Sequence, residues 1–468
     1  MNERSSNGVV RRIRAVLVAA AAMVLVVAVG VVVAPSRAVA ADTAPSRAAV
    51  FTKGYDSTKI VTLTFDSDWP TSDDERTRAN ISSVLDTLAA NGITAGFGLT
   101  GRFVAQNQDA TRAIAAGGHK LINHSWDHPD FLTLSQAARW SQLDRAEAAY
   151  RALGLTSAGW FRTPYRSGYL DPGVNRDLAL HGWYVNLDWT YDTTGYQAKP
   201  WSVISQRIDA YTVPGAILVM HVSAPSTDPG YLQAIIDKLK GMGYGFASPY
   251  RAVTVGGIRS KYLSLGGPSS AFGAPVTAEM VATTSGTAVQ WFQRGRIYWR
   301  SGVGTYYVFG GILTKYRSLG TVTSFLGFPL VDEQAGANGG RYQRFQGGSI
   351  YWSSATGAHT VNGGIRTKWT ALGAEAGFLG YPVSDEVAVT GGRASQFQGG
   401  NVYWSSATGA HEVHGPILSR YVSLGGTGSR LGLPTTDEYA VTGGRRADFQ
   451  HGAIVLDTAT GTTRVIYT

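Results

Sequence analysis

The chain of 468 residues contains no cysteine. Without cysteine, no disulfide can hold the fold together and no thiolate can serve as a nucleophile or a metal ligand. Charged side chains are also sparse, at 16% of residues, and no cluster of lysine and arginine stands out. These absences exclude a disulfide scaffold and a thiol enzyme, and they give no support to a nucleic-acid partner.

The first 40 residues show the pattern of a secretory signal peptide. Residues 1–14 carry four arginines against one acid, an apolar run extends from Ala15 to Ala34, and Ala38-Val39-Ala40 supplies a small-residue cleavage step. The apolar run could also span a bilayer, so an uncleaved anchor is the alternative. We predict cleavage after Ala40, a linker over 41–57, and a secreted, cell-wall-associated protein without a stable membrane span.

The C-terminal part of the chain repeats one pattern four times. Gly-x-Pro turns lie at 273–275, 327–329, 380–382 and 432–434, and Phe-Gln pairs lie at 292–293, 345–346, 397–398 and 449–450. Each copy also predicts a short helix, as at Ile312 to Leu319, an acidic pair such as Asp332-Glu333, and short strands such as Gly348 to Trp352. A unit this small cannot bury its own apolar face, so we expect the copies over 256–468 to pack on one another.

These copies resemble the LGFP repeat of envelope proteins of actinobacterial type, and one copy reads Leu326-Gly327-Phe328-Pro329. The resemblance implies a cell-wall polymer as the partner of this region. Recurring Tyr-Trp pairs allow two interpretations, packing between units or a face that stacks on sugar rings. These pairs are Tyr298-Trp299, Tyr351-Trp352 and Tyr403-Trp404. The last copy has Val455-Leu456 instead, which is typical of a capping repeat.

Residues 58–250 follow a different pattern, in which short apolar runs alternate with helical periodicity. The predicted strands are Ile60–Phe65, Ile93–Thr100, Lys120–Asn123, Gly159–Phe161, Trp183–Leu187 and Ala216–Met220. One predicted helix has an apolar face from Ile81 to Leu88, and another extends from Gln136 to Leu153. Alternation of this kind predicts an α/β fold with a parallel sheet, and about 190 residues suit a compact barrel.

Reactive side chains stand where the predicted strands end. Asp66, His124, Arg162, Asp188 and His221 each end or directly follow an apolar run. In a parallel barrel the carboxyl ends of the strands meet at one mouth, so we expect these five side chains to form a site.

The segment His124-Ser125-Trp126-Asp127-His128 is the strongest local signal. Two histidines at positions i and i+4 share one side of a helical turn, and that spacing lets both imidazoles reach one metal. Together with a carboxylate, they would leave positions open for water and a substrate oxygen.

Five short motifs then resemble, in order, the polysaccharide deacetylases of the NodB-homology type, carbohydrate esterase family 4. They are Thr64-Phe65-Asp66, His124-Ser125-x-x-His128, Arg162-Thr163-Pro164-Tyr165, Asp188-Trp189 and Val219-Met220-His221. The resemblance implies a distorted (β/α) barrel over residues 58–250. It also implies a divalent metal, commonly zinc, held by one aspartate and two histidines.

The resemblance assigns roles to individual residues. Asp66 would be the general base and Arg162 would keep it ionised. The backbone N–H of Tyr165 would help to hold the oxyanion, and His221 would be the general acid, sustained by Asp188 or a neighbour. Trp189, Tyr165 and Val219 would contact the substrate.

One departure concerns the metal ligand. The family places an aspartate directly after the base, but this chain has Ser67 there and the next acid is Asp68. Three interpretations stay open: Asp68 ligates with His124 and His128 through a shifted loop, Asp66 is itself the ligand, or the site binds metal poorly and is inactive. The fourth motif is ambiguous too, because Asp192 could replace Asp188.

The expected activity is hydrolysis of N-acetyl groups on an acetylated amino-sugar glycan, peptidoglycan or chitin-like. Two alternatives remain: an O-acetyl esterase acting on a xylan-type polysaccharide, and a non-catalytic wall-binding protein with a degenerate barrel site.

Overall fold

The computed structural model describes residues 44–67 and 74–468. The predicted signal segment and the candidate ligand Asp68 lie outside this part of the chain. Within the described ranges, no helix combines the length and the apolar character needed to cross a membrane.

The first domain is built on a nine-stranded sheet whose paired strands all run parallel, with the order β1-β6-β5-β4-β3-β2-β8-β7 and with β9 beside β2. The strands are β1 Ala49–Phe51, β2 Ile60–Ser67, β3 Gly96–Leu99, β4 Lys120–Asn123, β5 Trp160–Phe161, β6 Val185–Leu187, β7 Tyr191–Asp192, β8 Ile217–His221 and β9 Gly245–Phe246. This arrangement confirms the predicted α/β class and the distorted (β/α) barrel.

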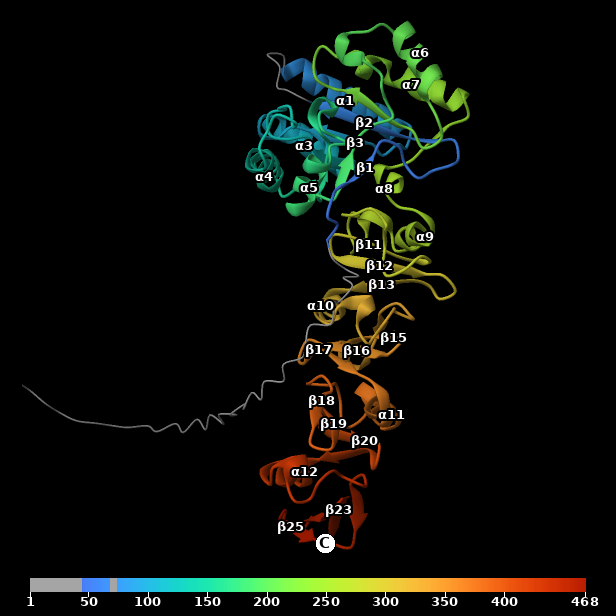
Figure 1. Cartoon of the computed structure of the whole chain (residues 1–468). Helices are drawn as coiled ribbons and strands as arrows, with labels where there is room; N and C mark the ends of the chain where they lie inside the picture. The colour runs from blue at the N-terminus through green and yellow to red at the C-terminus, as the bar shows by residue number, and fades with distance from the viewer. Residues whose placement is uncertain (1–43, 68–73) are drawn as a thin grey trace, which may run out of the picture. The chain divides into compact units, whose positions relative to one another are not determined.

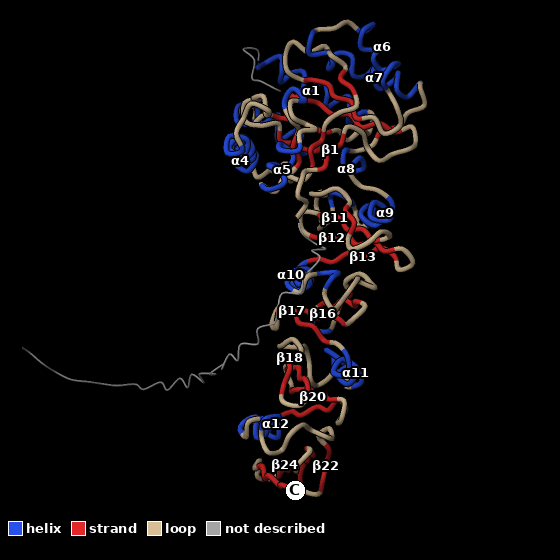
Figure 2. The backbone as a smooth tube through the Cα atoms, in the orientation of Figure 1, coloured by secondary structure: helices blue, strands red, loops and turns tan. Residues whose placement is uncertain are grey.

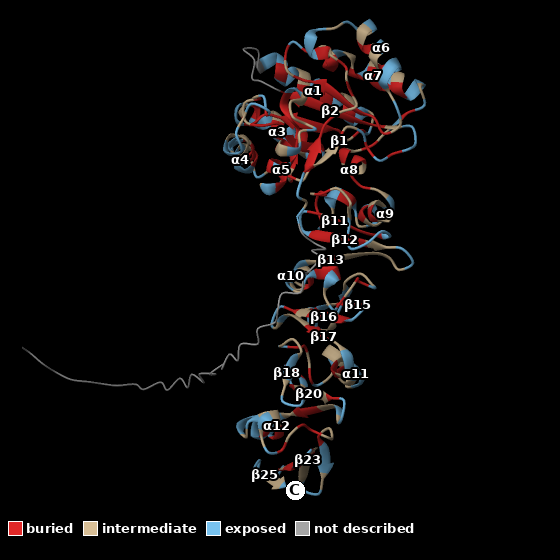
Figure 3. Ribbon diagram, viewed as in Figure 1, coloured by how far each residue is buried: buried red, intermediate tan, exposed pale blue. Residues whose placement is uncertain are grey.

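Helices lie around this sheet (Figures 1 and 2). They are α1 Asp74–Ala90, α2 Gly101–Gln106, α3 Gln108–Ala116, α4 Gln136–Ala152, α5 Pro172–Leu180, α6 Trp201–Tyr211, α7 Asp228–Gly241 and α8 Pro249–Ala252, with 3₁₀ turns at Pro164–Arg166 and Gly195–Gln197. The main core forms where Val84 and Leu88 of α1 and Ile236 of α7 pack on Leu63 and Phe65 of β2. Figure 3 shows the strands as buried and the outer helix faces as exposed.

Two predicted strands are shorter in the structure because their first residues close the preceding helix. The N–H of Ile93 donates to Leu88 O at 2.9 Å and that of Trp183 donates to Leu178 O at 2.9 Å. Each bond follows a glycine in the left-handed region, which is a usual way for a helix to end. Part of the segment predicted as a linker, Ala49–Phe51, instead forms strand β1 and pairs with β6.

Residues 256–467 form four units, each a helix followed by a four-stranded antiparallel sheet. The helices are α9 Gly256–Ser264, α10 Gly310–Ser318, α11 Gly363–Ala371 and α12 Gly415–Ser423, and 3₁₀ turns occupy Gly267–Ser269, Thr321–Thr323, Ala337–Gly339, Ala374–Ala376 and Gly426–Gly428. The strands of units 1 and 2 are β10 Met280–Val281, β11 Thr287–Trp291, β12 Gly295–Arg300, β13 Gly304–Phe309, β14 Gln334–Ala335, β15 Arg341–Phe345, β16 Gly348–Ser353 and β17 Gly357–Val361. Those of units 3 and 4 are β18 Val387–Val389, β19 Gly392–Phe397, β20 Gly400–Ser405, β21 Gly409–His414, β22 Tyr439–Val441, β23 Gly444–Phe449, β24 Gly452–Asp457 and β25 Thr463–Tyr467.

The recurring Gly-x-Pro and Phe-Gln markers bind each other inside every unit. In unit 2, Gln346 accepts the N–H of Phe328 at 2.9 Å, and the Tyr316 hydroxyl donates to Gly327 O at 2.6 Å. Gly327 has φ +63° and a Cβ there would meet Gln346 at 2.6 Å, so this turn requires glycine.

Neighbouring units share their cores, as the small size of one unit predicts. The sheet of unit 1 contributes Tyr298 and Val308 to a cluster with Ile312, Tyr316 and Leu326 of unit 2. The other two junctions repeat this arrangement. Tyr298, the tyrosine of the first Tyr-Trp pair, is therefore a packing residue.

The first acid of each acidic pair also joins two units. Asp385 of unit 3 accepts the N–H of Thr360 in unit 2 at 2.9 Å. It also forms an ion pair with Lys315, which lies in unit 2 as well. Equivalent pairs join Lys261 to Asp332 and Lys368 to Asp437.

Replacing Asp385 with alanine is expected to loosen the junction between units 2 and 3. The variant loses a charge-assisted hydrogen bond and leaves a half-buried lysine unpaired, at a cost of about 1–3 kcal/mol. Hydrogen exchange at the Thr360 amide should accelerate, while exchange at Tyr307, which Asp332 holds in the same way, should not change. Equal protection of Thr360 in both proteins would contradict this role.

Candidate active site

Four of the five predicted strand-end residues converge at the carboxyl edge of the sheet. Asp66 and His221 are directly paired in the register of β2 and β8. Arg162 follows β5, and its guanidinium donates from Nη1 to Asp66 Oδ1 at 2.6 Å. His124 follows β4, with Nε2 at 3.7 Å from Asp66 Oδ2.

Asp66 and Arg162 form a buried ion pair, with side chains 3% and 0% exposed. Arg162 is fixed by two further hydrogen bonds, to Leu187 O at 2.7 Å and to Thr64 Oγ1 at 3.1 Å. The carboxylate lies against the backbone of β3, where a Cβ on Gly98 would meet Asp66 Oδ1 at 2.3 Å. Glycine at position 98 therefore makes room for the carboxylate.

Opposing effects act on the charge of Asp66. Burial alone would raise its pKa, but the positive charge of Arg162, with smaller contributions from His124 and His221, holds the pKa below its ordinary value. Asp66 is therefore ionised in the neutral range and can accept a proton.

His124 and His128 bring their Nε2 atoms to within 3.1 Å of each other. They do so from a loop, so the predicted helical turn is wrong. Ser125 and His128 take left-handed φ values of 69° and 64°, and Ser125 Oγ accepts the His128 N–H at 2.9 Å. The local chain reversal, rather than helical periodicity, brings the two rings together.

The two imidazoles have the chemistry of metal ligands. His124 Nδ1 lies 3.0 Å from Arg162 O, a partner that orients the ring and leaves Nε2 as a lone-pair donor. Burial lowers the pKa of His124, which favours the neutral form that binds metals. Nitrogens 3.1 Å apart can both lie about 2.0–2.1 Å from one Zn²⁺.

The donor set therefore fits a divalent cation, although the described residues alone do not complete it. Within 44–67 and 74–468, no group of three histidine, aspartate or glutamate side chains is arranged to hold a metal. Ser67, at the position where the family has its aspartate, places its hydroxyl 2.9 Å from Ser223 Oγ.

These side chains open into one cavity of about 230 Å³. It is lined by Asp66, His124, His128, Tyr165, Trp189, Asp192, Tyr196 and His221. The Tyr165 ring lies against His128, with centroids 4.2 Å apart, and the Tyr196 ring lies against His221 at 4.8 Å. Tyr165 has a left-handed φ of 58° and is 69% exposed, so it stands at the mouth of the cavity.

Asp188, the acid of the fourth motif, forms an ion pair with Arg166. Its carboxylate is buried and accepts Arg166 Nε at 2.8 Å, and Arg166 also stacks over the Trp189 ring. Burial raises the pKa of Asp188, while Arg166 opposes this shift. Asp188 thus fixes Arg166 and, through it, the indole that walls the cavity.

Two other acids act on His221. Asp192, the alternative in the fourth motif, lines the cavity, and burial raises its pKa while His221 lowers it. Asp228, the first residue of α7, accepts the backbone N–H of His221 at 2.9 Å, and burial raises its pKa to about 6. A Cβ at Gly195 would meet Asp228 within 2.5 Å, so that glycine admits the carboxylate.

Val219, predicted to contact the substrate, is fully buried in β8 and is not among the residues that line this cavity. The sequence interpretation missed Tyr196, Arg166 and Asp228. Arg166 directly follows the third motif, and this position could have marked it as a site residue. Tyr196 and Asp228 reach the site through the fold alone.

Comparisons with known proteins show which families the chain resembles. Residues 53–182 match the family model for polysaccharide deacetylase, and residues 272–324, 326–377, 379–429 and 431–467 match that for the LGFP repeat. The chain is 32% identical over 186 residues to a chitin deacetylase of Colletotrichum lindemuthianum. The aligned residues cover 37% of this chain and 71% of that protein. The chain belongs to the polysaccharide deacetylase family, and it carries four LGFP repeats after the family domain.

A second relative is the peptidoglycan-N-acetylglucosamine deacetylase PgdA of Listeria monocytogenes. It is 29% identical over 190 residues, which cover 41% of this chain and 38% of the relative's length. Among solved structures, the Colletotrichum chitin deacetylase matches with a TM-score of 0.38 at 26% identity, over 43% of this chain and 90% of that one.

Proposed function

We propose that the protein is a secreted, metal-dependent deacetylase that hydrolyses N-acetyl groups of an amino-sugar glycan of the cell envelope, peptidoglycan or chitin-like. The repeats would hold it at a cell-wall polymer. The observation that carries the proposal is the ionised Asp66, paired with Arg162, in one cavity with His124, His128 and His221. The family relationship and the names of the relatives support the substrate class.

His124 and His128 would hold the divalent cation, with Asp68 as a third ligand, and imidazole nitrogens are ligands that suit zinc. When bound, the cation would polarise the acetyl carbonyl and lower the pKa of a water molecule.

Asp66 would take a proton from the attacking water, because its carboxylate is ionised and lies 3.7 Å from His124 Nε2. Arg162 would keep that carboxylate charged and oriented. The backbone N–H of Tyr165 would donate to the oxyanion that forms as the carbonyl carbon becomes tetrahedral.

His221 would deliver a proton to the departing nitrogen as the carbon–nitrogen bond breaks, leaving acetate and a free amine. Asp192 and Asp228 favour the protonated imidazole that this step requires. Trp189, held by Arg166, would form the wall against the acetyl methyl group.

The test is to incubate the protein with an N-acetylglucosamine oligomer and, separately, with an acetylated xylan. Equal gains of acetate and primary amine on the first substrate are expected. If acetate is released only from the xylan and leaves a free hydroxyl group, the protein is an O-acetyl esterase and the proposal is wrong.

A second candidate function is glycan binding without hydrolysis, and Ser67 is the observation that favours it. This position has a hydroxyl bonded to Ser223 instead of a carboxylate. Glycan binding without any acetate release, in protein supplied with zinc, would establish that function.

A further inference from the structure

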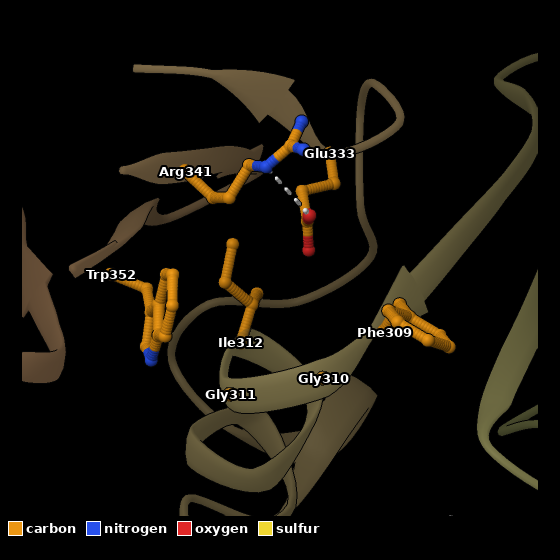
Figure 4. Close-up of a pocket in the computed structure, with 7 residues that line it drawn as sticks. All are labelled: Phe309, Gly310, Gly311, Ile312, Glu333, Arg341 and Trp352. Atoms are coloured by element: carbon orange, nitrogen blue, oxygen red, sulfur yellow. Dashed lines mark ion pairs between the residues drawn. The ribbon is translucent and has the colours of Figure 1, made fainter. Parts of the chain in front are cut away.

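Unit 2 of the repeat region contains a cavity of about 280 Å³ beside the first turn of α10. Figure 4 shows the residues that line it, which are Phe309, Gly310, Gly311, Ile312, Glu333, Arg341 and Trp352. The volume is at the small end of ligand sites in proteins, and it suits one sugar ring better than a peptide segment.

Two aromatic side chains lie on opposite sides of this cavity. Trp352 stands on one side and Phe309 on the other, with Ile312 between them (Figure 4). The indole lies directly on the first turn of the helix, since a Cβ on Gly311 would meet Trp352 Cδ1 at 2.5 Å. Glycine at this position thus holds the indole at the edge of the cavity, where it stays partly exposed.

A carboxylate and a guanidinium complete the lining. The Glu333 side chain points in between the two rings, and Arg341 Nε lies 3.8 Å from its Oε1 (Figure 4). Glu333 is only 14% exposed, whereas Arg341 is 52% exposed. Together these groups accept and donate hydrogen bonds without net charge, which suits neutral hydroxyl groups rather than an ion.

Unit 3 carries the same indole, arginine and glutamate, with Asn362 at the position of Phe309. Arg341 is directly opposite Trp352 in the register of β15 and β16, and Arg393 is opposite Trp404 in β19 and β20. Arg393 pairs with Glu386, and a Cβ on Gly364 would meet the Trp404 indole at 2.4 Å.

The outer units each lack one member. Unit 1 has Ala288 opposite Trp299, so the arginine is missing. Unit 4 has Leu456 opposite Arg445, so the indole is missing. The full combination of indole, arginine and glutamate therefore occurs in units 2 and 3, and the difference does not follow from folding, because all four units share the same sheet.

We propose that units 2 and 3 each bind one neutral sugar residue of a wall polysaccharide. The indole packs on a face of the sugar ring, Glu333 or Glu386 accepts hydroxyl protons, and Arg341 or Arg393 donates to ring or hydroxyl oxygens. This inference rests on the proposed attachment of the repeats to the wall and specifies where and how it occurs. It is independent of the catalytic cavity.

The residues found in units 1 and 4 at these positions indicate substitutions that are compatible with the fold. Trp352→Leu with Trp404→Leu copies unit 4, and Arg341→Ala with Arg393→Ala copies unit 1. Arg445→Ala in unit 4 is the matched control, since that unit has no indole to lose.

The experiment measures binding of the purified full chain by titration calorimetry with three probes. These are a neutral hexose tetrasaccharide, an N-acetylglucosamine tetramer and a uronic acid tetramer, and all proteins carry Asp66→Asn so that hydrolysis of the probes is slowed. Each double variant is expected to weaken binding of a neutral probe at least tenfold, and Arg445→Ala to leave it unchanged.

Each outcome decides the proposal. If the double variants weaken only the hexose probe, the sites take a polymer other than the substrate; if they weaken the N-acetylglucosamine probe, the sites take the substrate itself. Binding of the uronic acid probe alone, or neutral binding that the double variants do not change, overturns the proposal. Acetate release by the same double variants, with Asp66 restored, should equal that of wild type on a soluble oligomer, which separates this inference from the proposed catalysis.

Discussion

Replacing Asp66 with asparagine is expected to lower the turnover number for acetate release about a thousandfold, since a positioned general base contributes roughly 10²–10⁴. The amide cannot accept the proton of water, and Arg162 loses the negative charge of the carboxylate that it contacts at 2.6 Å. Initial rates on an N-acetylglucosamine oligomer measure the effect. The variant is also expected to be less stable, because it leaves a fully buried guanidinium unpaired, a loss of about 3–5 kcal/mol in comparable sites.

The control separates chemistry from stability. Asp177 is equally buried, at 3% exposed, and accepts a hydrogen bond from Arg139 Nη1 at 2.7 Å between α4 and α5. It does not line the catalytic cavity. Asp177→Asn should lower the melting temperature by a similar amount and leave the turnover number within a factor of three. A thousandfold loss in this control, or full turnover in Asp66→Asn, would contradict the assignment of the base.

The second large effect is expected from His124→Ala. Because the imidazole supplies one of two nitrogens only 3.1 Å apart, its removal should reduce bound zinc from about one atom per chain to less than a tenth and abolish acetate release. In wild type, zinc at 100 times its dissociation constant should stabilise the domain by about 2.7 kcal/mol. Elemental analysis and thermal unfolding with and without zinc measure both.

His119→Ala is the matched control for this variant. His119 directly precedes the same strand, β4, but lies at its other end, where Nδ1 accepts the Ala95 N–H at 3.1 Å. The control should bind zinc as wild type does. Normal zinc content in His124→Ala would show that the histidine pair is not a metal site.

Strand-end residues were predictable because a parallel sheet brings them together whatever their spacing in the chain. Asp66 and His221 are 155 positions apart by number, yet they are register partners in adjacent strands. The repeat units were predictable for a related reason. Markers such as Gly327 and Gln346 recur because they bind each other inside each unit.

Other features depend on geometry that sequence patterns do not carry. The i, i+4 histidine spacing predicted a helical turn, but Ser125 and His128 adopt left-handed conformations that bring the rings together from a loop. Asp188 was assigned to the fourth motif from its place in the chain, and in space its carboxylate contacts Arg166. Asp228 accepts the backbone N–H of His221 because α7 begins next to that residue. No local sequence pattern predicts this contact.

Ser67 and Asp68 mark the point at which the family pattern and this chain differ. The Ser67 hydroxyl is bonded to Ser223, so a carboxylate ligand would have to come from elsewhere. We propose Asp68 for this role, and Asp68→Ala should reduce zinc affinity without changing the Asp66–Arg162 pair.

The most direct test of metal-dependent deacetylation measures acetate release from an N-acetylglucosamine oligomer by the purified protein, before and after chelation and again after zinc is restored. The account predicts hydrolysis that chelation abolishes and zinc recovers, with one amine formed for each acetate. Undiminished hydrolysis in the chelated protein, or none after zinc is restored, would contradict it.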